Sequence, residues 1–126
     1  MNLYFLRHGL AAERDARQFP DDSRRPLLPK GRARLRKGCD ALRAMEISFD
    51  WILSSPYPRA SQTAEIVAAA LDLKKRLVFR DELAPGGDPR SLVRYVNSLQ
   101  SDPQDVMLVG HEPDLSQLIA FLPGSV

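Results

Sequence analysis

The chain has 126 residues, of which 44% are hydrophobic and 27% are charged, and its formal net charge is +2. A chain of this length forms one domain with one core, and so small a net charge gives no reason to expect nucleic acid or membrane lipid as a partner. A single cysteine excludes a disulfide within the chain, and the lack of a membrane span or signal-peptide pattern favours a cytoplasmic location.

The chain opens with an apolar stretch, residues 1–6, that predicts a short buried strand ending just before Arg7 and His8. This strand lies in the basic half of the sequence. Residues 1–60 carry 12 Lys and Arg against 7 Asp and Glu, whereas residues 61–126 carry 6 against 9. The excess of positive charge around the first strand favours an anionic ligand there.

Residues 10–29 are polar and contain three prolines, so they predict a long loop, and long loops in compact domains are often functional. A helix is expected to begin near Pro29, because proline is tolerated in the first helical turn. Apolar residues recur in it at helical spacing, at Leu35, Cys39, Leu42 and Met45. Its basic residues are expected mainly on the solvated faces: Lys30, Arg32, Arg34, Arg36 and Lys37.

The rest of the chain alternates strands with helices. Strands are expected at 50–55, 76–79 and 105–111, and helices at 58–71, from Pro89 to about Gln100, and at 112–122. Asp88 is expected to cap the helix that begins at Pro89. This alternation predicts a parallel sheet covered on both faces, that is, a three-layer α/β/α sandwich formed by a single domain over 1–126.

Polar and charged residues follow each of the four predicted strands. In a parallel sheet the carboxyl ends of the strands share one edge, where ligands bind. The sequence therefore places these residues together: Arg7 and His8, then Ser54, Ser55 and Arg59, then Glu82, and finally His111.

Two arginines and two histidines at one edge would form a cationic pocket suited to a phosphoryl group. A neutral imidazole can attack phosphorus and form a phosphohistidine, so His8 is the candidate nucleophile. Arg7, Arg59 and His111 would stabilise the negative charge that develops on the phosphoryl oxygens. Glu82 could protonate the leaving group as a general acid.

Three segments resemble the histidine phosphatase superfamily, which has the phosphoglycerate mutase-like fold. They are "LRHG" at 6–9, "SSPYPRASQTA" at 54–64 and "VGHEPDLS" at 109–116. "RRPLLPKG" at 24–31 and "DELAPGGD" at 81–88 look most like the small SixA-type phosphohistidine phosphatases. The resemblance implies a phosphorylated nucleophile at His8, phosphate binding by Arg7, Arg59 and His111, a proton donor near Glu82, and no metal cofactor.

Two features depart from the family pattern. Leu28 stands where relatives often have Thr before the first helix, so a side-chain cap is expected to be missing there. The sequence ends at "LPGSV", whereas relatives continue with at least one more strand. We therefore expect the domain to lack its C-terminal strand or strands, which would leave an open or partner-covered sheet edge.

Several alternatives remain at this point. Glu82 could be a plain surface carboxylate, Arg7 could pair with Asp15, and Ser54 and Ser55 are expected to shape a turn rather than act as nucleophiles. A zinc site at the histidines lacks the usual ligand spacing. The substrate is expected to be phosphohistidine on a protein or, alternatively, a small phosphorylated metabolite such as a sugar phosphate or nucleotide. An alternative from a different class of function is a regulatory module that binds phosphate without catalytic turnover.

Overall fold

The computed structural model describes residues 2–9, 11, 21, 24–99, 105–112 and 114–119. The elements along the chain are β1 (Asn2–Arg7), α1 (Pro29–Ala44), β2 (Trp51–Ser54), α2 (Pro58–Ala70), β3 (Leu77–Phe79), α3 (Pro89–Ser98), β4 (Asp105–Gly110) and α4 (Asp114–Ile119). Single turns of 3-10 helix, Lys74–Arg76 and Asp81–Leu83, flank β3. Most of the predicted loop over 10–29 and the predicted helix ends at Gln100 and at residue 122 lie outside the described residues.

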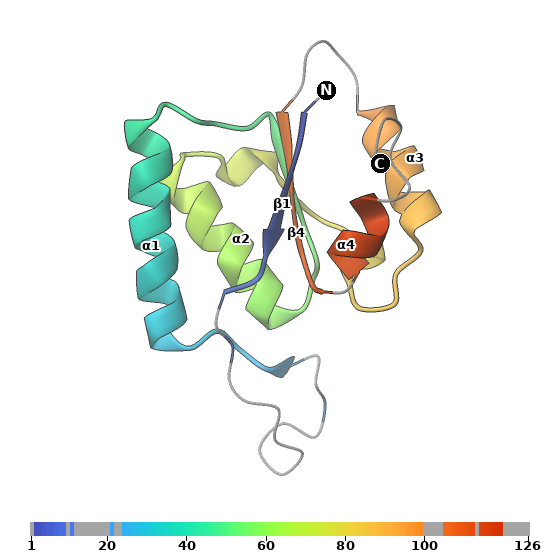
Figure 1. Ribbon diagram of the computed structural model, residues 1–126, viewed down its shortest axis with the longest axis horizontal. Helices are drawn as coiled ribbons and strands as arrows, with labels where there is room; N and C mark the ends of the chain where they lie inside the picture. The colour runs from blue at the N-terminus through green and yellow to red at the C-terminus, as the bar shows by residue number, and fades with distance from the viewer. Residues whose placement is uncertain are drawn as a thin grey trace.

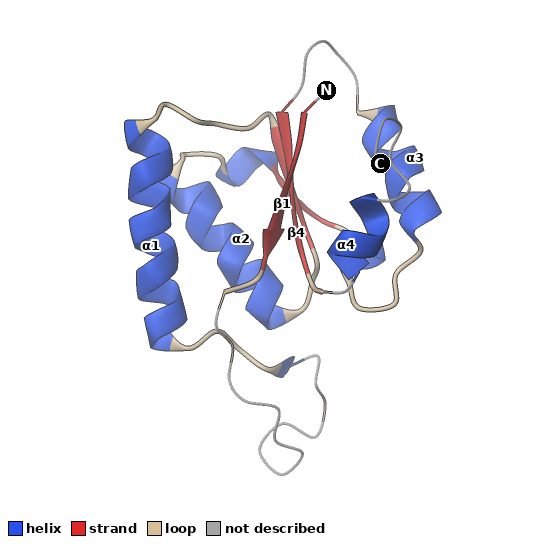
Figure 2. Ribbon diagram, in the orientation of Figure 1, coloured by secondary structure: helices blue, strands red, loops and turns tan. Residues whose placement is uncertain are grey.

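The four strands form one sheet in the order β1-β4-β2-β3, and all three pairings are parallel (Figure 2). In register, Arg7 lies opposite Gly110, while Ser54 lies opposite both Val109 and Phe79. The last residues of all four strands therefore reach the same edge of the sheet, as the alternating sequence predicts.

Helices cover both faces of this sheet, with α1 and α2 on one side and α3 and α4 on the other (Figure 1). The strands supply both cores by alternation, because successive side chains of a strand point to opposite faces. Under α1 and α2 lie the buried side chains of Ile52, Met107 and Val109 with Cys39 and the alanines of α2. Under α3 and α4 lie Leu53, Val106 and Leu108 with Leu83, Leu92, Val96, Leu115 and Leu118. The three-layer α/β/α fold is confirmed.

The expectation of a buried first strand is wrong. Among the described strands β1 lies at the edge of the sheet, none of its residues is fully buried, and Tyr4 is 40% exposed. An apolar run looks alike in a central and in an edge strand, because the order of strands depends on long-range pairing. Met45, expected on the apolar face of the first helix, is also exposed, because it follows the last turn of α1.

The helix starts follow the sequence closely. α1, α2 and α3 each have proline in the first turn. Asp88 caps α3, since its Oδ1 accepts a hydrogen bond from the Arg90 amide at 3.0 Å. Leu28 supplies no side-chain cap to α1, as its apolar side chain predicts. No helix in the described part of the chain is both long enough and apolar enough to span a membrane.

Candidate active site

The carboxyl ends of β1 and β4 bring the two histidines of the chain together. The His8 amide donates to the Gly110 carbonyl at 3.0 Å, which carries the β1 pairing one residue past the strand. The rings of His8 and His111 then lie 5.2 Å apart, centroid to centroid. Within the described ranges, no group of three or more His, Cys, Asp or Glu side chains could hold a metal ion.

A backbone contact fixes the orientation of the His8 ring. His8 Nδ1 lies 2.7 Å from the carbonyl oxygen of Gly9. A carbonyl oxygen can only accept, so Nδ1 must carry the proton and donate it. In the neutral ring the lone pair is then on Nε2, and this nitrogen is the nucleophilic one.

Thr63 of α2 holds the loop that carries His8. Its Oγ1 accepts a hydrogen bond from the Gly9 amide at 3.0 Å and donates one to the Arg59 carbonyl at 2.7 Å. The side chain is fully buried, and its bond to the Arg59 carbonyl is shielded from water, whereas the bond from the Gly9 amide is part-buried. Sequence reasoning did not single out Thr63, although its place in "SQTA", four residues after Arg59, was a usable signal.

The surroundings of His8 favour its neutral form. Burial is the main cause that lowers the pKa of His8 below its ordinary value of 6.5, and the positive charges of Arg59, Arg7 and Arg25 lower it further. The hydrogen bond to Gly9 acts in the opposite direction. Arg25 was not among the predicted site residues, and the sequence offered no signal for it beyond its place in "RRP".

His111 lies against the loop that follows β2. Its side chain is 3% exposed, and its Nε2 lies 2.8 Å from Ser55 Oγ. That oxygen also accepts the Tyr57 amide at 3.2 Å, which leaves the hydroxyl proton available for the imidazole. Ser55 therefore shapes the turn, as expected, and also orients His111.

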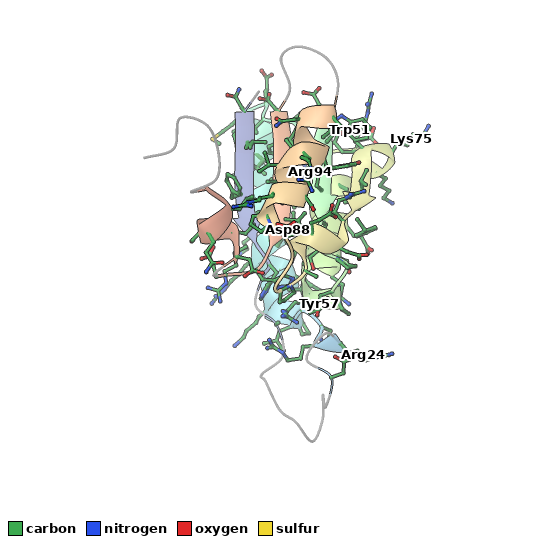
Figure 3. All side chains as sticks on the ribbon, turned by 90° about the vertical axis from the view of Figure 1, so that its right-hand side faces the viewer. Arg24, Trp51, Tyr57, Lys75, Asp88 and Arg94 are labelled. Carbon is green, nitrogen blue, oxygen red and sulfur yellow. The ribbon has the colours of Figure 1, made fainter. Side chains whose placement is uncertain are left out.

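Tyr57 contacts both His111 and Arg59. It was not identified as a candidate site residue from the sequence. Its ring lies 5.5 Å from the His111 ring in an edge-to-face arrangement, and the guanidinium carbon of Arg59 lies 5.3 Å from its centroid. Arg59 is 3% exposed. In Figure 3, Tyr57 lies toward the same end of the molecule as Arg24, opposite Trp51 and Lys75. The site thus occupies the end of the domain where the strands finish.

Glu82 reaches this end of the sheet in an ion pair with Arg80. The Arg80 amide donates to the Ser54 carbonyl at 2.8 Å, next to the turn that holds His111. Arg80 Nη2 lies 2.7 Å from Glu82 Oε2, and its guanidinium carbon lies 3.8 Å from the centre of the Tyr95 ring. The hydrogen bond from Arg80 is the main cause that lowers the pKa of Glu82. A carboxylate held in this way favours the unprotonated form.

Comparison with known proteins agrees with this arrangement. The family model described as the histidine phosphatase superfamily (branch 1) matches residues 3–84. The chain belongs to the histidine phosphatase superfamily. It is 32% identical over 126 residues to the phosphohistidine phosphatase SixA of Escherichia coli K12, covering 98% of this chain and 76% of that protein. It is also 40% identical over 125 residues to an uncharacterized protein of Picosynechococcus, covering 96% and 74%.

A solved structure of the protein histidine phosphatase SixA in complex with tungstate has the same architecture. It matches with a TM-score of 0.84 and 32% identity, over 98% of this chain and 78% of that one. A phosphoglycerate mutase from Plasmodium falciparum, 14% identical with a TM-score of 0.67, shares the fold. The chain is therefore a phosphatase of the SixA type, as the motifs indicated.

Proposed function

We propose that this phosphatase removes the phosphoryl group from phosphohistidine on a protein, through a phosphorylated His8 and without a metal ion. The proposal gives each group of the site one role. His8 is the nucleophile, and Arg7, Arg59 and His111 hold the phosphoryl oxygens. Arg25, whose charge acts on His8, joins them.

In the first step, His8 Nε2 attacks phosphorus and forms a P–N bond while the bond from phosphorus to the substrate nitrogen breaks. The orientation set by Gly9 and the lowered pKa of His8 support this role, because both keep a lone pair on Nε2 at neutral pH. The cationic groups stabilise the charge on the equatorial oxygens. The SixA relative holds tungstate, itself a tetrahedral oxyanion, which is consistent with such a pocket.

In the second step, water attacks the phosphorus of phosphorylated His8. The P–Nε2 bond breaks and its electron pair returns to Nε2 as the lone pair of the neutral ring, while the water oxygen and both of its protons leave with phosphorus as dihydrogen phosphate. The Gly9 carbonyl remains hydrogen-bonded to Nδ1–H throughout, so the ring returns to its starting tautomer.

The observation that carries the choice of substrate is the ion pair between Arg80 and Glu82. An alkyl alcohol leaves phosphorus poorly unless an acid protonates it, whereas the imidazole of phosphohistidine can already carry a proton on its second nitrogen. A carboxylate whose pKa is lowered by Arg80 is a poor proton donor. The pair therefore favours a phosphoramidate over an alkyl phosphate.

The test compares three substrates under matched conditions: a phosphohistidine-containing protein, p-nitrophenyl phosphate and an alkyl phosphate. We expect kcat/KM to be highest for the phosphoprotein and lowest for the alkyl phosphate. Rates with and without a chelator test the absence of a metal requirement. A preference for an alkyl sugar phosphate or nucleotide would contradict the proposed substrate, and loss of activity with chelator would contradict the metal-free mechanism.

A further inference from the structure

A large hollow in the described part of the surface lies between α1 and α2, outside the predicted catalytic residues. It is a groove of about 880 Å³ with a basic wall formed by Arg32, Arg36, Arg43 and Lys74. Two acids, Asp40 and Glu65, also line it. Asp40 is already paired with Arg43, whereas Arg36 and Lys74 have no ion-pair partner among the described residues. The groove therefore presents unneutralised positive charge.

The floor of this groove is apolar. Ile66, Ala69, Ala70 and Leu77 contribute to its lining between the charged residues. Free phosphate or a nucleic-acid backbone needs positive charge but no apolar floor. A surface with one apolar and one cationic part instead complements an amphipathic segment with acidic residues along its polar side.

The shape of the groove fits a helix. Arg32 and Arg43 are 11 positions apart on α1, a distance of about 16 Å along a helix axis. Such a length accommodates roughly three turns of a partner helix. α1 and α2 lie side by side on one face of the sheet, with their N-termini toward the edge where the strands end (Figure 1). A third helix can pack between two such helices by ridges-into-grooves contacts.

The groove begins next to the candidate active site. Gln62 lines it, and Gln62 Oε1 accepts a hydrogen bond from the Leu27 amide at 2.9 Å. Its neighbour Thr63 holds the Gly9 amide beside His8. A helix bound in the groove would therefore place its near end toward the phosphoryl pocket.

We propose that the groove between α1 and α2 docks an acidic amphipathic helix of the phosphohistidine-bearing protein. This inference rests on the proposed function, because the docked protein is the substrate. Docking would lower KM for a helical substrate and leave the chemical step unchanged, since none of the groove cations is assigned to the phosphoryl pocket.

The probes are two synthetic helical peptides of about six turns, each with one histidine near one end, phosphorylated with potassium phosphoramidate. Both carry leucines at helical spacing, but one has glutamates on its polar side and the other has glutamines. With the wild-type protein we expect a KM roughly 10-fold lower for the glutamate peptide, with similar kcat, as two charge pairs would give. Equal KM values would overturn the docking proposal.

A matched pair of variants locates the effect. Arg36→Glu/Lys74→Glu reverses two charges of the groove, whereas Arg34→Glu/Lys37→Glu reverses two exposed charges of α1 that do not line it. We expect the lower KM of the glutamate peptide to disappear in Arg36→Glu/Lys74→Glu and to be mostly retained in Arg34→Glu/Lys37→Glu. If the KM difference between the peptides falls equally in both double variants, it depends only on the overall charge of the protein, and the groove is not the docking site.

Free phosphohistidine separates failure of the docking proposal from failure of the proposed function. Both double variants should hydrolyse it at the wild-type rate. If the wild-type protein hydrolyses neither free phosphohistidine nor the peptides, the proposed function fails. Inorganic polyphosphate tests whether the groove is a simple anion site. The helix proposal is wrong if polyphosphate inhibits hydrolysis of the glutamate and glutamine peptides equally in the wild type and inhibits neither in Arg36→Glu/Lys74→Glu.

Discussion

At the scale of single residues, the same positive charges serve two purposes at His8. Burial is the main cause that lowers the pKa of His8, and the charges of Arg59, Arg7 and Arg25 add to it, so that Nε2 is kept unprotonated before substrate arrives. In the proposed mechanism, those charges pair with the phosphoryl dianion once it is bound. His8 would then remain an uncharged nucleophile beside a strongly charged substrate, which a solvent-exposed histidine near neutral pH achieves only in part.

The first prediction concerns this nucleophile. His8→Ala should fold, because His8 is only half-buried, but should lose nearly all turnover, because no other described group can take its place in the intermediate. Rapid-quench labelling with phosphorylated substrate should give an acid-labile, base-stable label on the wild-type protein and none on the variant. Substantial turnover by His8→Ala would refute the covalent mechanism.

The second prediction concerns the control that Arg80 exerts over Glu82. Arg80→Met removes the ion pair but keeps an apolar stem against Tyr95. The pKa of Glu82 should rise toward its ordinary value of 4.5 or above, because its main lowering cause is gone. We expect hydrolysis of an alkyl phosphate to rise roughly 10-fold relative to phosphohistidine, within the range of general-acid effects.

The double variant Arg80→Met/Glu82→Gln is the control for this second prediction. Glutamine cannot supply the proton, so the gain on alkyl phosphate should disappear. Glu82→Gln alone should change phosphohistidine hydrolysis only slightly. If Arg80→Met leaves the ratio between the two substrates unchanged, Glu82 is not a proton donor in this protein, and Arg80 does not set its substrate preference.

At the scale of elements, α2 holds both the loop after β1 and the segment that leads into α1. Thr63 receives the Gly9 amide, and its own proton goes to the carbonyl of Arg59 one turn earlier. Gln62, the residue before it, receives the Leu27 amide from the segment that leads into α1. Two neighbouring residues of a single helix thus position two parts of the chain that are distant from it in sequence.

The third prediction tests this role of α2. Thr63→Val keeps the shape of the buried side chain but leaves the Gly9 amide without its acceptor. An unsatisfied buried donor costs about 1–3 kcal/mol, so unfolding by urea should begin at lower concentration. Because the same loop carries His8, kcat should also fall. Thr63→Ser retains the hydroxyl and should keep most of kcat despite losing a methyl group; equal losses of kcat in both variants would mean that the hydrogen bond does not position His8.

The sequence predicted the elements and the strand-end residues because both depend on local patterns. Proline in the first turn marked the helices that begin at Pro29 and Pro89, and Asp88 marked a cap. The position of β1 at the sheet edge could not be read from its apolar run, since pairing with β4 depends on contacts about 100 residues away. The ion pair of Arg80 with Glu82 was also not predicted, although the two residues are only two apart, because it forms where the chain enters the 3-10 turn Asp81–Leu83.

At the scale of the whole molecule, one sheet separates two cores and carries the candidate active site where its strands end. Alternate residues of β2 and β4 belong to the two cores, so neither face can loosen without disturbing the other. The amides of His8 and of Ser55, which contacts His111, both donate to the end of β4, at the carbonyls of Gly110 and Val109. Stability of the fold and geometry of the site are therefore coupled, and protonation of the site should be visible in global unfolding.

The fourth prediction follows from that coupling. The pKa of His8 is lowered in the folded protein from an ordinary value of 6.5, so the native state resists a proton that the unfolded chain accepts. The contribution of neutral His8 to the free energy of unfolding should therefore be fully present above pH 6.5. It should decrease as the pH falls from there toward the pKa of His8 in the folded protein. One proton contributes at most about 1.4 kcal/mol per pH unit to this slope. Glu82 and Asp88, whose pKa values are also lowered, lose their contributions only at more acidic pH, through and below their ordinary values.

Urea unfolding of the wild-type protein and of His8→Asn, at pH 7.5 and at pH 5.5, measures this effect. Asparagine can still donate toward the Gly9 carbonyl but does not titrate, and His111 is present in both proteins. The difference in unfolding free energy between the two pH values should be smaller in the variant, because only the wild-type native state excludes a proton from residue 8. Saturating inorganic phosphate should reduce the pH dependence of the wild type, since a bound dianion raises the pKa of His8. If the two proteins show the same pH dependence, His8 titrates alike in the folded and unfolded chains, and the positive charges around it do not keep its nucleophilic nitrogen unprotonated.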